Sequence, residues 1–190
     1  AIMSPGEFCY FDSYQDAPDS QPEAIGGYLP LSKVYSFNPV PDTLSADKVQ
    51  LVYGVQANLF TEYIPTPEHA EMMIYPRILA LAEVAWSAPS VKNYDDFHIR
   101  ALKEVEALKA EGYHPFELKN EIGNRPGADQ PVQHLAVGKK VAYGPDAAYY
   151  PGYSAGGDSA LVDGVIGGWT YGDRRWQGFI DKKRMDVTID

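Results

Sequence analysis

The chain has 190 residues, of which 45% are hydrophobic, a composition that suits a globular protein with an apolar core. Its formal net charge of −10 makes it a poor electrostatic partner for nucleic acid or for anionic lipid. No run of residues approaches the ~20 apolar side chains that a membrane-spanning helix needs, and the single cysteine, Cys9, excludes an internal disulfide.

The first part of the chain predicts two strands separated by a long irregular stretch. Residues 1–4 are apolar, and residues 8–14 are rich in aromatic side chains, which favours an extended segment. Residues 49–60 predict the next strand. The intervening residues 16–51 are rich in Pro, Gly, Ser and Asp, and a loop of this length usually contains some structure of its own. Short helical turns are expected there near residues 31–35 and 45–48.

Two helical regions are predicted after the second strand. Thr66 is a suitable N-cap and Pro67 suits the first helical position, and the apolar side chains from there to Trp86 recur at helical spacing. Pro76 interrupts this stripe, which predicts a kink or two abutting helices. A second amphipathic helix is predicted over residues 95–110. Strand, loop, strand and helix in this order are typical of an α/β barrel.

The composition changes beyond residue 119. Residues 120–134 are rich in Asn, Gly, Pro, Asp and Gln, which indicates a linker. Residues 135–190 lose the helical periodicity, and short runs between turn residues, such as 137–141 and 185–189, predict an all-β region. This region carries equal numbers of basic and acidic side chains, so the whole acidic excess lies before it. Two differently built regions are therefore expected.

Two short segments of the first region carry candidate binding groups. Alternate residues of a strand share a face, so Tyr10 and Asp12 are expected to point the same way, as are Phe60 and Glu62 while their strand lasts. The strand ends of a barrel and the loops behind them form its pocket. A phenol, two carboxylates and an aromatic ring suit a sugar, because carboxylates bind hydroxyl pairs and rings stack on C–H faces. Spacing alone, however, favours polar groups satisfied within the core.

Three segments resemble glycoside hydrolase family 20 β-N-acetylhexosaminidases, in matching order and spacing. Met3-Ser4-Pro5 with Tyr10-Phe11-Asp12-Ser13-Tyr14-Gln15 resembles the region of their seventh barrel strand. The segment Gly54-Val-Gln-Ala-Asn-Leu-Phe-Thr-Glu62 resembles their eighth-strand motif, and Tyr75-Pro-Arg-Ile-Leu-Ala-Leu-Ala-Glu-Val-Ala-Trp86 resembles the helix that follows. The resemblance covers residues 1–116. It implies that residues 1–119 are the C-terminal portion of a (β/α)8 TIM barrel.

The resemblance also implies roles for the four candidate side chains. Tyr10 is similar to a catalytic tyrosine that donates a hydrogen bond to the 2-acetamido oxygen of the substrate. Asp12 resembles a polar residue at the edge of the pocket, and Glu62 resembles the carboxylate that binds the outer hydroxyls of the sugar. Phe60 stands where the family usually has Trp, so it can stack on the sugar with less area and without an indole N–H.

The family's chemistry depends on residues that this sequence lacks. A neighbouring Asp-Glu pair does the work there: the Glu protonates the leaving oxygen, and the Asp orients the substrate's own acetamido group for attack on the anomeric carbon. No Asp-Glu dipeptide occurs in this sequence, so the pair is expected upstream of Ala1 and the chain alone is expected to be inactive. No cofactor is expected, and the four histidines show no metal-ligand spacing.

The final region resembles the N-terminal part of a discoidin-like (factor 5/8 C-type) β-sandwich, with jelly-roll architecture. The resemblance rests on Ala160-Leu-Val-Asp-Gly164, on Trp176-Gln-Gly-Phe179 and on the strand pattern of residues 186–190. It implies a partial sandwich over residues 135–190, after the linker. Such sandwiches often bind sugars.

Five further side chains are expected to be structural. Arg77 and Glu83 are expected to form an ion pair in the helical region, and Trp86 to be a core residue at a helix end. Trp169 and Trp176 are expected to belong to the core of the sandwich rather than to a ligand platform.

Taken together, these features predict a fragment of an exo-acting β-N-acetylhexosaminidase that removes terminal N-acetylhexosamine from glycans by substrate-assisted retaining catalysis. The expected partner is such a glycan, and the open barrel fragment is expected either to self-associate or to be loosely packed. The resemblance implies a periplasmic, cell-surface or secreted protein. Two alternatives remain at this point: a carbohydrate-binding protein without catalysis, and a purely structural segment.

Overall fold

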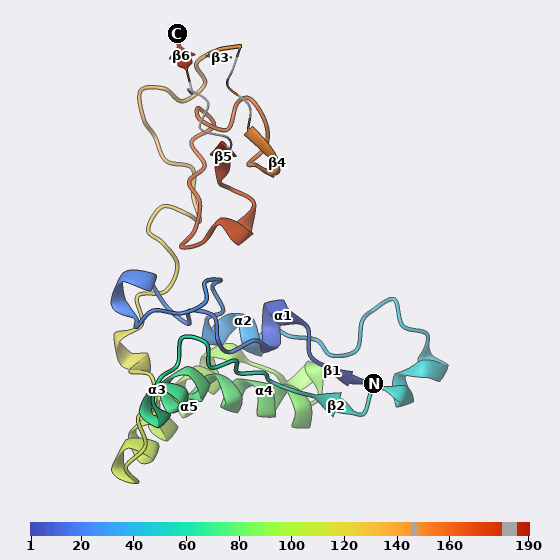
Figure 1. Cartoon of the computed structure of the whole chain (residues 1–190). Helices are drawn as coiled ribbons and strands as arrows, with labels where there is room; N and C mark the ends of the chain where they lie inside the picture. The colour runs from blue at the N-terminus through green and yellow to red at the C-terminus, as the bar shows by residue number, and fades with distance from the viewer. Residues whose placement is uncertain (146, 148, 180–185) are drawn as a thin grey trace. The chain divides into compact units, whose positions relative to one another are not determined.

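The computed structural model describes residues 1–145, 147, 149–179 and 186–190 (Figure 1). It divides into two compact units, Ala1–Gly123 and Asn124–Asp190. The division falls within the stretch predicted as a linker, but the first residues of that stretch pack into the first unit. Asp16 is buried there, and its carboxylate accepts hydrogen bonds from the backbone N–H groups of Ile122 and Gly123 at 2.8 and 2.9 Å.

The first unit contains a short parallel strand pair. β1 (Ile2–Met3) pairs with β2 (Gly54–Val55), with Ile2 opposite Gly54, and the two strands lie side by side near the N-terminus in Figure 1. Parallel strands need a long crossover between them, and the irregular stretch of residues 16–51 lies within it. The second strand is much shorter than the predicted residues 49–60, because a 3-10 helix occupies the residues before it.

Helical turns also replace part of the first predicted extended segment. α1 (Gly6–Cys9) includes the first residues of the aromatic stretch 8–14, and the rest of that stretch keeps two isolated parallel bridges, Tyr10 to Asn58 and Tyr14 to Tyr28. The predicted turn near residues 31–35 is confirmed as α2 (Leu31–Tyr35). The 3-10 helices of the unit are Pro18–Ser20, Ala46–Leu51, Pro89–Val91 and Leu118–Asn120.

Three longer helices follow the predicted pattern closely. α3 (Pro67–Ile74) begins after Thr66, whose hydroxyl accepts a hydrogen bond from the backbone N–H of His69 at 3.2 Å. Pro76 separates α3 from α4 (Arg77–Trp86), which confirms two abutting helices. The second amphipathic helix is α5 (Tyr94–Ala110), and its buried face is formed by Phe97, Ala101 and Val105.

The core of the first unit gathers side chains from α1, α2, α4 and α5. Cys9 is completely buried, as expected for a small apolar side chain. Trp86 is 91% exposed at the end of α4, so its prediction as a core residue was wrong: the apolar stripe of α4 buries only its inward face. The buried side chains of this core are Cys9, Phe11, Leu29, Leu31, Val34, Tyr35, Phe37, Ala80, Leu81, Val84, Phe97, Ala101, Val105, Phe116 and Leu118.

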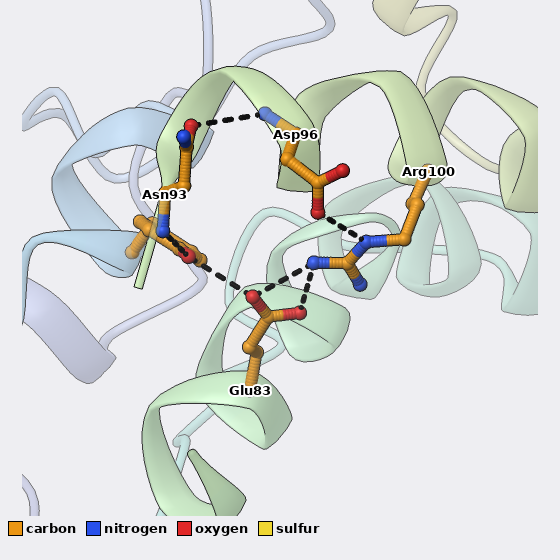
Figure 2. A network of polar contacts seen from close by, with 5 residues as sticks. Glu83, Asn93, Asp96 and Arg100 are labelled. Carbon is orange, nitrogen blue, oxygen red and sulfur yellow. Dashed lines mark hydrogen bonds and ion pairs between the residues drawn. The ribbon is translucent and has the colours of Figure 1, made fainter. Parts of the chain in front are cut away.

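A polar network around Glu83 joins α4 to α5 (Figure 2). The Glu83 carboxylate lies 2.7 Å from the Arg100 guanidinium, which also bonds Asp96 at 2.9 Å, and it accepts a 2.9 Å hydrogen bond from the Tyr35 hydroxyl. The predicted Arg77–Glu83 ion pair was therefore wrong. The two residues lie on the same helix, but Arg77 is fully buried and Glu83 faces α5.

The second unit is built from two antiparallel strand pairs among the residues that the structure describes. β3 (Val141–Tyr143) pairs with β6 (Val187–Ile189), and β4 (Tyr149–Ser154) pairs irregularly with β5 (Gln177–Phe179). The run predicted over residues 137–141 is a strand only from Val141 onward. Of the run 185–189, Met185 lies outside the described residues. A 3-10 helix, Tyr171–Asp173, precedes β5.

No helix among the described residues is long and apolar enough to cross a membrane.

Candidate functional site

The structure brings two of the four predicted site residues, Tyr10 and Phe60, into contact. The bridge between Tyr10 and Asn58 is closed by two backbone hydrogen bonds of 2.8 Å, from Phe11 N–H to the Asn58 carbonyl and from Asn58 N–H to the Cys9 carbonyl. This register sets the Tyr10 ring against that of Phe60, with centroids 5.6 Å apart and planes tilted by 56°. Phe60 remains 56% exposed, so the ring pair borders solvent.

Asn58 locks the two segments together with its side chain as well. Its amide Nδ2 donates to the Ser4 hydroxyl at 2.6 Å, and that hydroxyl donates to the Gln56 carbonyl at 2.8 Å. Gln56 in turn donates to the Asn58 Oδ1 at 2.9 Å. These bonds fix the spacing of the β1 and β2 segments just before the site. Sequence reasoning did not single out Asn58, although it lies inside the eighth-strand motif.

Arg77 holds the backbone that follows Tyr10 in the chain. Its guanidinium is fully buried and donates to the Ser13 and Leu29 carbonyls at 2.9 and 3.1 Å, and also to those of Phe11 and Met73. Burial lowers the Arg77 pKa to about 9, and the charge of the nearby Asp12 opposes this shift. Arg77 therefore anchors the Phe11–Ser13 backbone to α4. The motif beginning at Tyr75 contained this residue, but its spacing suggested an ion pair instead.

Asp12 is a buried carboxylate with spare acceptor capacity. It is 6% exposed, and its Oδ1 has no hydrogen-bond partner among the described residues. Such a buried oxygen is costly unless a partner satisfies it, and the Arg77 charge supplies part of the compensation. Phe11 and Asp12 lie in a turn rather than a strand, so the argument that Tyr10 and Asp12 share a strand face does not apply.

Glu62 lies two residues beyond Phe60 in the chain. It occupies an exposed turn in which the Ile64 N–H donates to the Thr61 carbonyl at 3.2 Å. Because β2 ends at Val55, Phe60 and Glu62 do not share a strand face either. Within the described part of the chain, Glu62 makes no hydrogen bond or ion pair. Its carboxylate is thus free to meet a ligand.

Two buried side chains support the loop behind Tyr10. The Gln15 amide donates to the Met72 carbonyl on α3 at 2.7 Å, and Asp16 accepts the bonds from residues 122 and 123 already described. Burial, and then the Asp16 charge, raise the Glu121 pKa to about 7. Neither Asp16 nor Glu121 was predicted to be important. The bonds from Asp16 to residues 122 and 123 join distant parts of the chain, so no local sequence pattern predicts them.

The described residues contain no cluster of His, Cys, Asp and Glu that could hold a metal ion. The Cys9 thiol lies close to Tyr10 in sequence but is completely buried, and burial raises its pKa to about 11. A thiol in that state is a poor nucleophile. The chemistry that the site offers is hydrogen bonding and ring stacking.

Comparison with known proteins shows which families and structures the first unit is similar to. Residues 1–89 match the family model for the glycosyl hydrolase family 20 catalytic domain. The chain is 48% identical over 97 residues to a β-hexosaminidase of Porphyromonas gingivalis, an alignment that covers 50% of this chain and 12% of the relative. It is 33% identical over 104 residues to a β-N-acetylhexosaminidase of Cellulomonas fimi, covering 55% of this chain and 21% of that protein.

Solved structures of family 20 enzymes also superimpose on part of this chain. A family 20 β-N-acetylhexosaminidase from Streptomyces coelicolor superimposes with a TM-score of 0.53 and 26% identity, over 60% of this chain and 23% of that chain. A family 20 exo-β-N-acetylglucosaminidase from Vibrio harveyi, in complex with N-acetylglucosamine, gives 0.52 and 28%, over 62% and 19%. The chain thus spans less than a quarter of each of these relatives.

Proposed function

We propose that this chain is the C-terminal part of the catalytic barrel of a family 20 β-N-acetylhexosaminidase, followed by a β-rich unit. The complete protein would be a glycoside hydrolase that removes terminal N-acetylhexosamine from glycans. The observation that carries the proposal is the Tyr10–Phe60 ring pair, because the bridge at Asn58 joins the two motifs that carry the family resemblance. The family match over residues 1–89 supports the same reading.

Within this proposal each side chain has a separate task. The Tyr10 hydroxyl donates to the acetamido oxygen and so positions the internal nucleophile. The half-exposed Phe60 stacks on the sugar ring. Asp12, whose buried Oδ1 has no hydrogen-bond partner among the described residues, accepts a hydrogen bond from a sugar hydroxyl, and Glu62 accepts from outer hydroxyls. Glu62 reaches the sugar from its own exposed turn.

The reaction is proposed to be retaining and substrate-assisted. A protonated Glu gives its proton to the leaving oxygen, while the acetamido oxygen attacks the anomeric carbon and an Asp orients the amide. Neither of these two groups is assigned to a residue of this sequence, which contains no Asp-Glu dipeptide. The residues present here bind and orient the sugar for that step.

For the second unit we propose a partial discoidin-like sandwich. Its two antiparallel strand pairs, β3–β6 and β4–β5, are compatible with such a fold. We also propose that the complete protein acts in the periplasm, at the cell surface or after secretion, which cell fractionation with an antibody against this chain would test.

The rival function is carbohydrate binding without hydrolysis, and the hydrolase names of the matched relatives do not favour it. Assaying the complete protein separates the two. We expect it to release nitrophenol from p-nitrophenyl β-N-acetylglucosaminide but not from the matching β-glucoside, which has no acetamido group to attack. Equal turnover of both would contradict substrate assistance, and binding without turnover of either would favour the rival.

A further inference from the structure

The second unit carries an exposed aromatic cluster that the proposed hydrolase site does not use. Tyr153, Tyr171 and Trp176, with Gln177 and Gly178, line a depression of about 310 Å³. The Tyr153 and Tyr171 rings meet edge to face at 5.4 Å and 89°. Tyr171 is 64% exposed, and Trp176 is also exposed, contrary to its predicted place in a core. Aromatic walls with a few polar groups are typical of small-ligand sites.

The indole of Trp176 is fixed in place rather than free at the surface. The Arg125 guanidinium lies over its ring at 5.2 Å from the centroid and also donates to the Gly167 carbonyl at 3.0 Å. A Cβ at Gly167 would lie 2.0 Å from the indole Nε1, so only glycine allows this packing. Ring and guanidinium are therefore held before any ligand arrives, which lowers the entropic cost of binding.

A basic pocket adjoins the aromatic depression and shares Trp176 and Gln177 with it. This pocket, of about 340 Å³, is lined by Arg125, Arg175 and His134 among others. Within the described ranges, neither arginine forms an ion pair with a carboxylate. The nearby Asp173 instead accepts hydrogen bonds from the backbone N–H groups of Gly168 and Arg175. Both guanidinium groups donate to backbone carbonyls, Arg125 to Gly167 and Arg175 to Ala128, so their charge is held in place without being offset by a carboxylate of the described residues.

We propose that this surface binds an acidic sugar residue, a pyranose ring that bears a carboxylate or a sulfate group. The ring stacks in the Tyr153, Tyr171 and Trp176 depression, and the anionic group enters the neighbouring pocket. Arginine suits this role because its planar donors match the oxygens of both anions. The combination of stacking rings with guanidinium groups that no carboxylate neutralises, among the described residues, is the feature that favours an acidic sugar over a neutral one.

Calorimetry with the 190-residue chain tests the proposal with three tetrasaccharides. Hyaluronan supplies carboxylates, and chondroitin 4-sulfate supplies carboxylates and sulfates. Chitotetraose is the neutral control, titrated into the Phe60→Ala chain so that binding at the proposed hydrolase site does not contribute. We expect at least one acidic probe to bind at least about tenfold more tightly than chitotetraose, with the advantage shrinking as salt rises from 50 to 500 mM. A stronger response to chondroitin sulfate identifies sulfate as the preferred anion, and similar binding of both identifies the carboxylate.

Four single-residue variants test whether the acidic tetrasaccharide binds to this surface or to the proposed hydrolase site. Tyr171→Ala should weaken the acidic probe about tenfold, and Arg175→Gln should remove most of its advantage over chitotetraose. Tyr53→Ala, an 80% exposed tyrosine of the first unit, and Phe60→Ala should leave acidic binding unchanged. Circular dichroism checks the fold, and Arg175→Gln, an exposed polar exchange, remains informative if Tyr171→Ala misfolds.

Several results would overturn the proposal. These are no binding of either acidic probe, equal affinity for chitotetraose, or unchanged affinity in folded Arg175→Gln. Loss of binding of the acidic tetrasaccharides in Phe60→Ala would show that they bind to the first unit instead. None of these outcomes bears on hydrolysis by the complete protein, which is measured separately.

Discussion

At the scale of single residues, the buried guanidinium of Arg77 determines where the candidate site lies. It satisfies backbone carbonyls that would otherwise be buried without donors, and it neutralises part of the Asp12 charge. The sequence motif contained Arg77, but periodicity alone could not reveal that its partners are carbonyls 48 and 64 residues away. Tyr10 and Phe60 were predictable as site candidates, whereas the exposed turn that holds Glu62 depends on where β2 ends.

Replacing Arg77 by Lys should therefore destabilise the chain strongly. Lysine keeps the charge but offers a single donor centre, so several buried carbonyls lose their partners at about 1–3 kcal/mol each. We expect the free energy of unfolding in urea to fall by at least about 3 kcal/mol. Arg100→Lys is the matched control, because that ion pair is half exposed and should cost less than about 1 kcal/mol. Equal effects of the two changes would contradict the anchoring role.

Glu62 is testable in the complete protein by replacement with Gln, which keeps the shape and removes the charge. If its carboxylate accepts two sugar hydroxyls, and those bonds tighten in the transition state, kcat/KM should fall about tenfold to a hundredfold. The melting temperature should stay constant, because Glu62 is exposed and unpaired among the described residues. A near-normal kcat/KM would refute the sugar-binding role.

At the scale of elements, helices were predicted better than strands. The signals of α3, α4 and α5 are local: the Thr66 cap, the break at Pro76 and an apolar stripe that repeats every turn. Strand length instead depends on neighbouring strands, and β1 and β2 have only each other as described partners. The α1 turn likewise includes Phe8, although the aromatic composition of residues 8–14 favours an extended chain. The Phe8 ring stacks on that of Phe37, just after α2, and this tertiary contact is not visible in the local sequence.

The C-terminal end of the first unit should respond to pH through Glu121. Its pKa is raised to about 7 by burial and by Asp16, from an ordinary 4.5, so folding favours its protonated form. The stability this provides is complete below about pH 4.5 and is lost as pH rises toward 7. His98, 3.9 Å from Glu121, is the basic group that faces it.

Glu121→Gln removes this titration. We expect the variant to be more stable than the parent chain at pH 8, by on the order of 1–3 kcal/mol, and nearly equal to it at pH 4.5. Urea unfolding at both pH values measures the difference, with Glu104→Gln, an exposed exchange on α5, as the control. A variant less stable at pH 8 would show that ionised Glu121 is favourably paired with His98.

At the scale of the whole molecule, composition predicts an acidic, mixed α/β part followed by a neutral, all-β part. In the chain, the boundary between the two compact units falls between Gly123 and Asn124. The assignment of the β-rich unit to a discoidin-like sandwich stays a prediction. Its ligand surface could not be predicted, because Tyr153, Tyr171 and Trp176 are brought together by the pairing of β4 with β5.

The isolated chain should self-associate, because its parallel strand pair has open edges and Ile2 and Trp86 are largely exposed. Light scattering should give a mass above the 21.0 kDa of one chain. A compact monomer across micromolar concentrations would contradict this expectation.

The same isolated chain should not hydrolyse a chromogenic N-acetylglucosaminide. General acid catalysis is typically worth about 10²- to 10⁴-fold, and the sequence lacks the Asp-Glu pair that the family resemblance requires. Turnover that survives repurification of the chain would show that another carboxylate acts as the acid.

The central claim is that Tyr10 positions the acetamido group of the substrate, and one measurement tests it most directly. Tyr10→Phe in the complete protein removes a single hydroxyl and keeps the ring that contacts Phe60. We predict that kcat for p-nitrophenyl β-N-acetylglucosaminide falls on the order of 10²- to 10³-fold with little change in KM, while Tyr53→Phe has no effect. An unchanged kcat in a folded Tyr10→Phe protein would contradict the account.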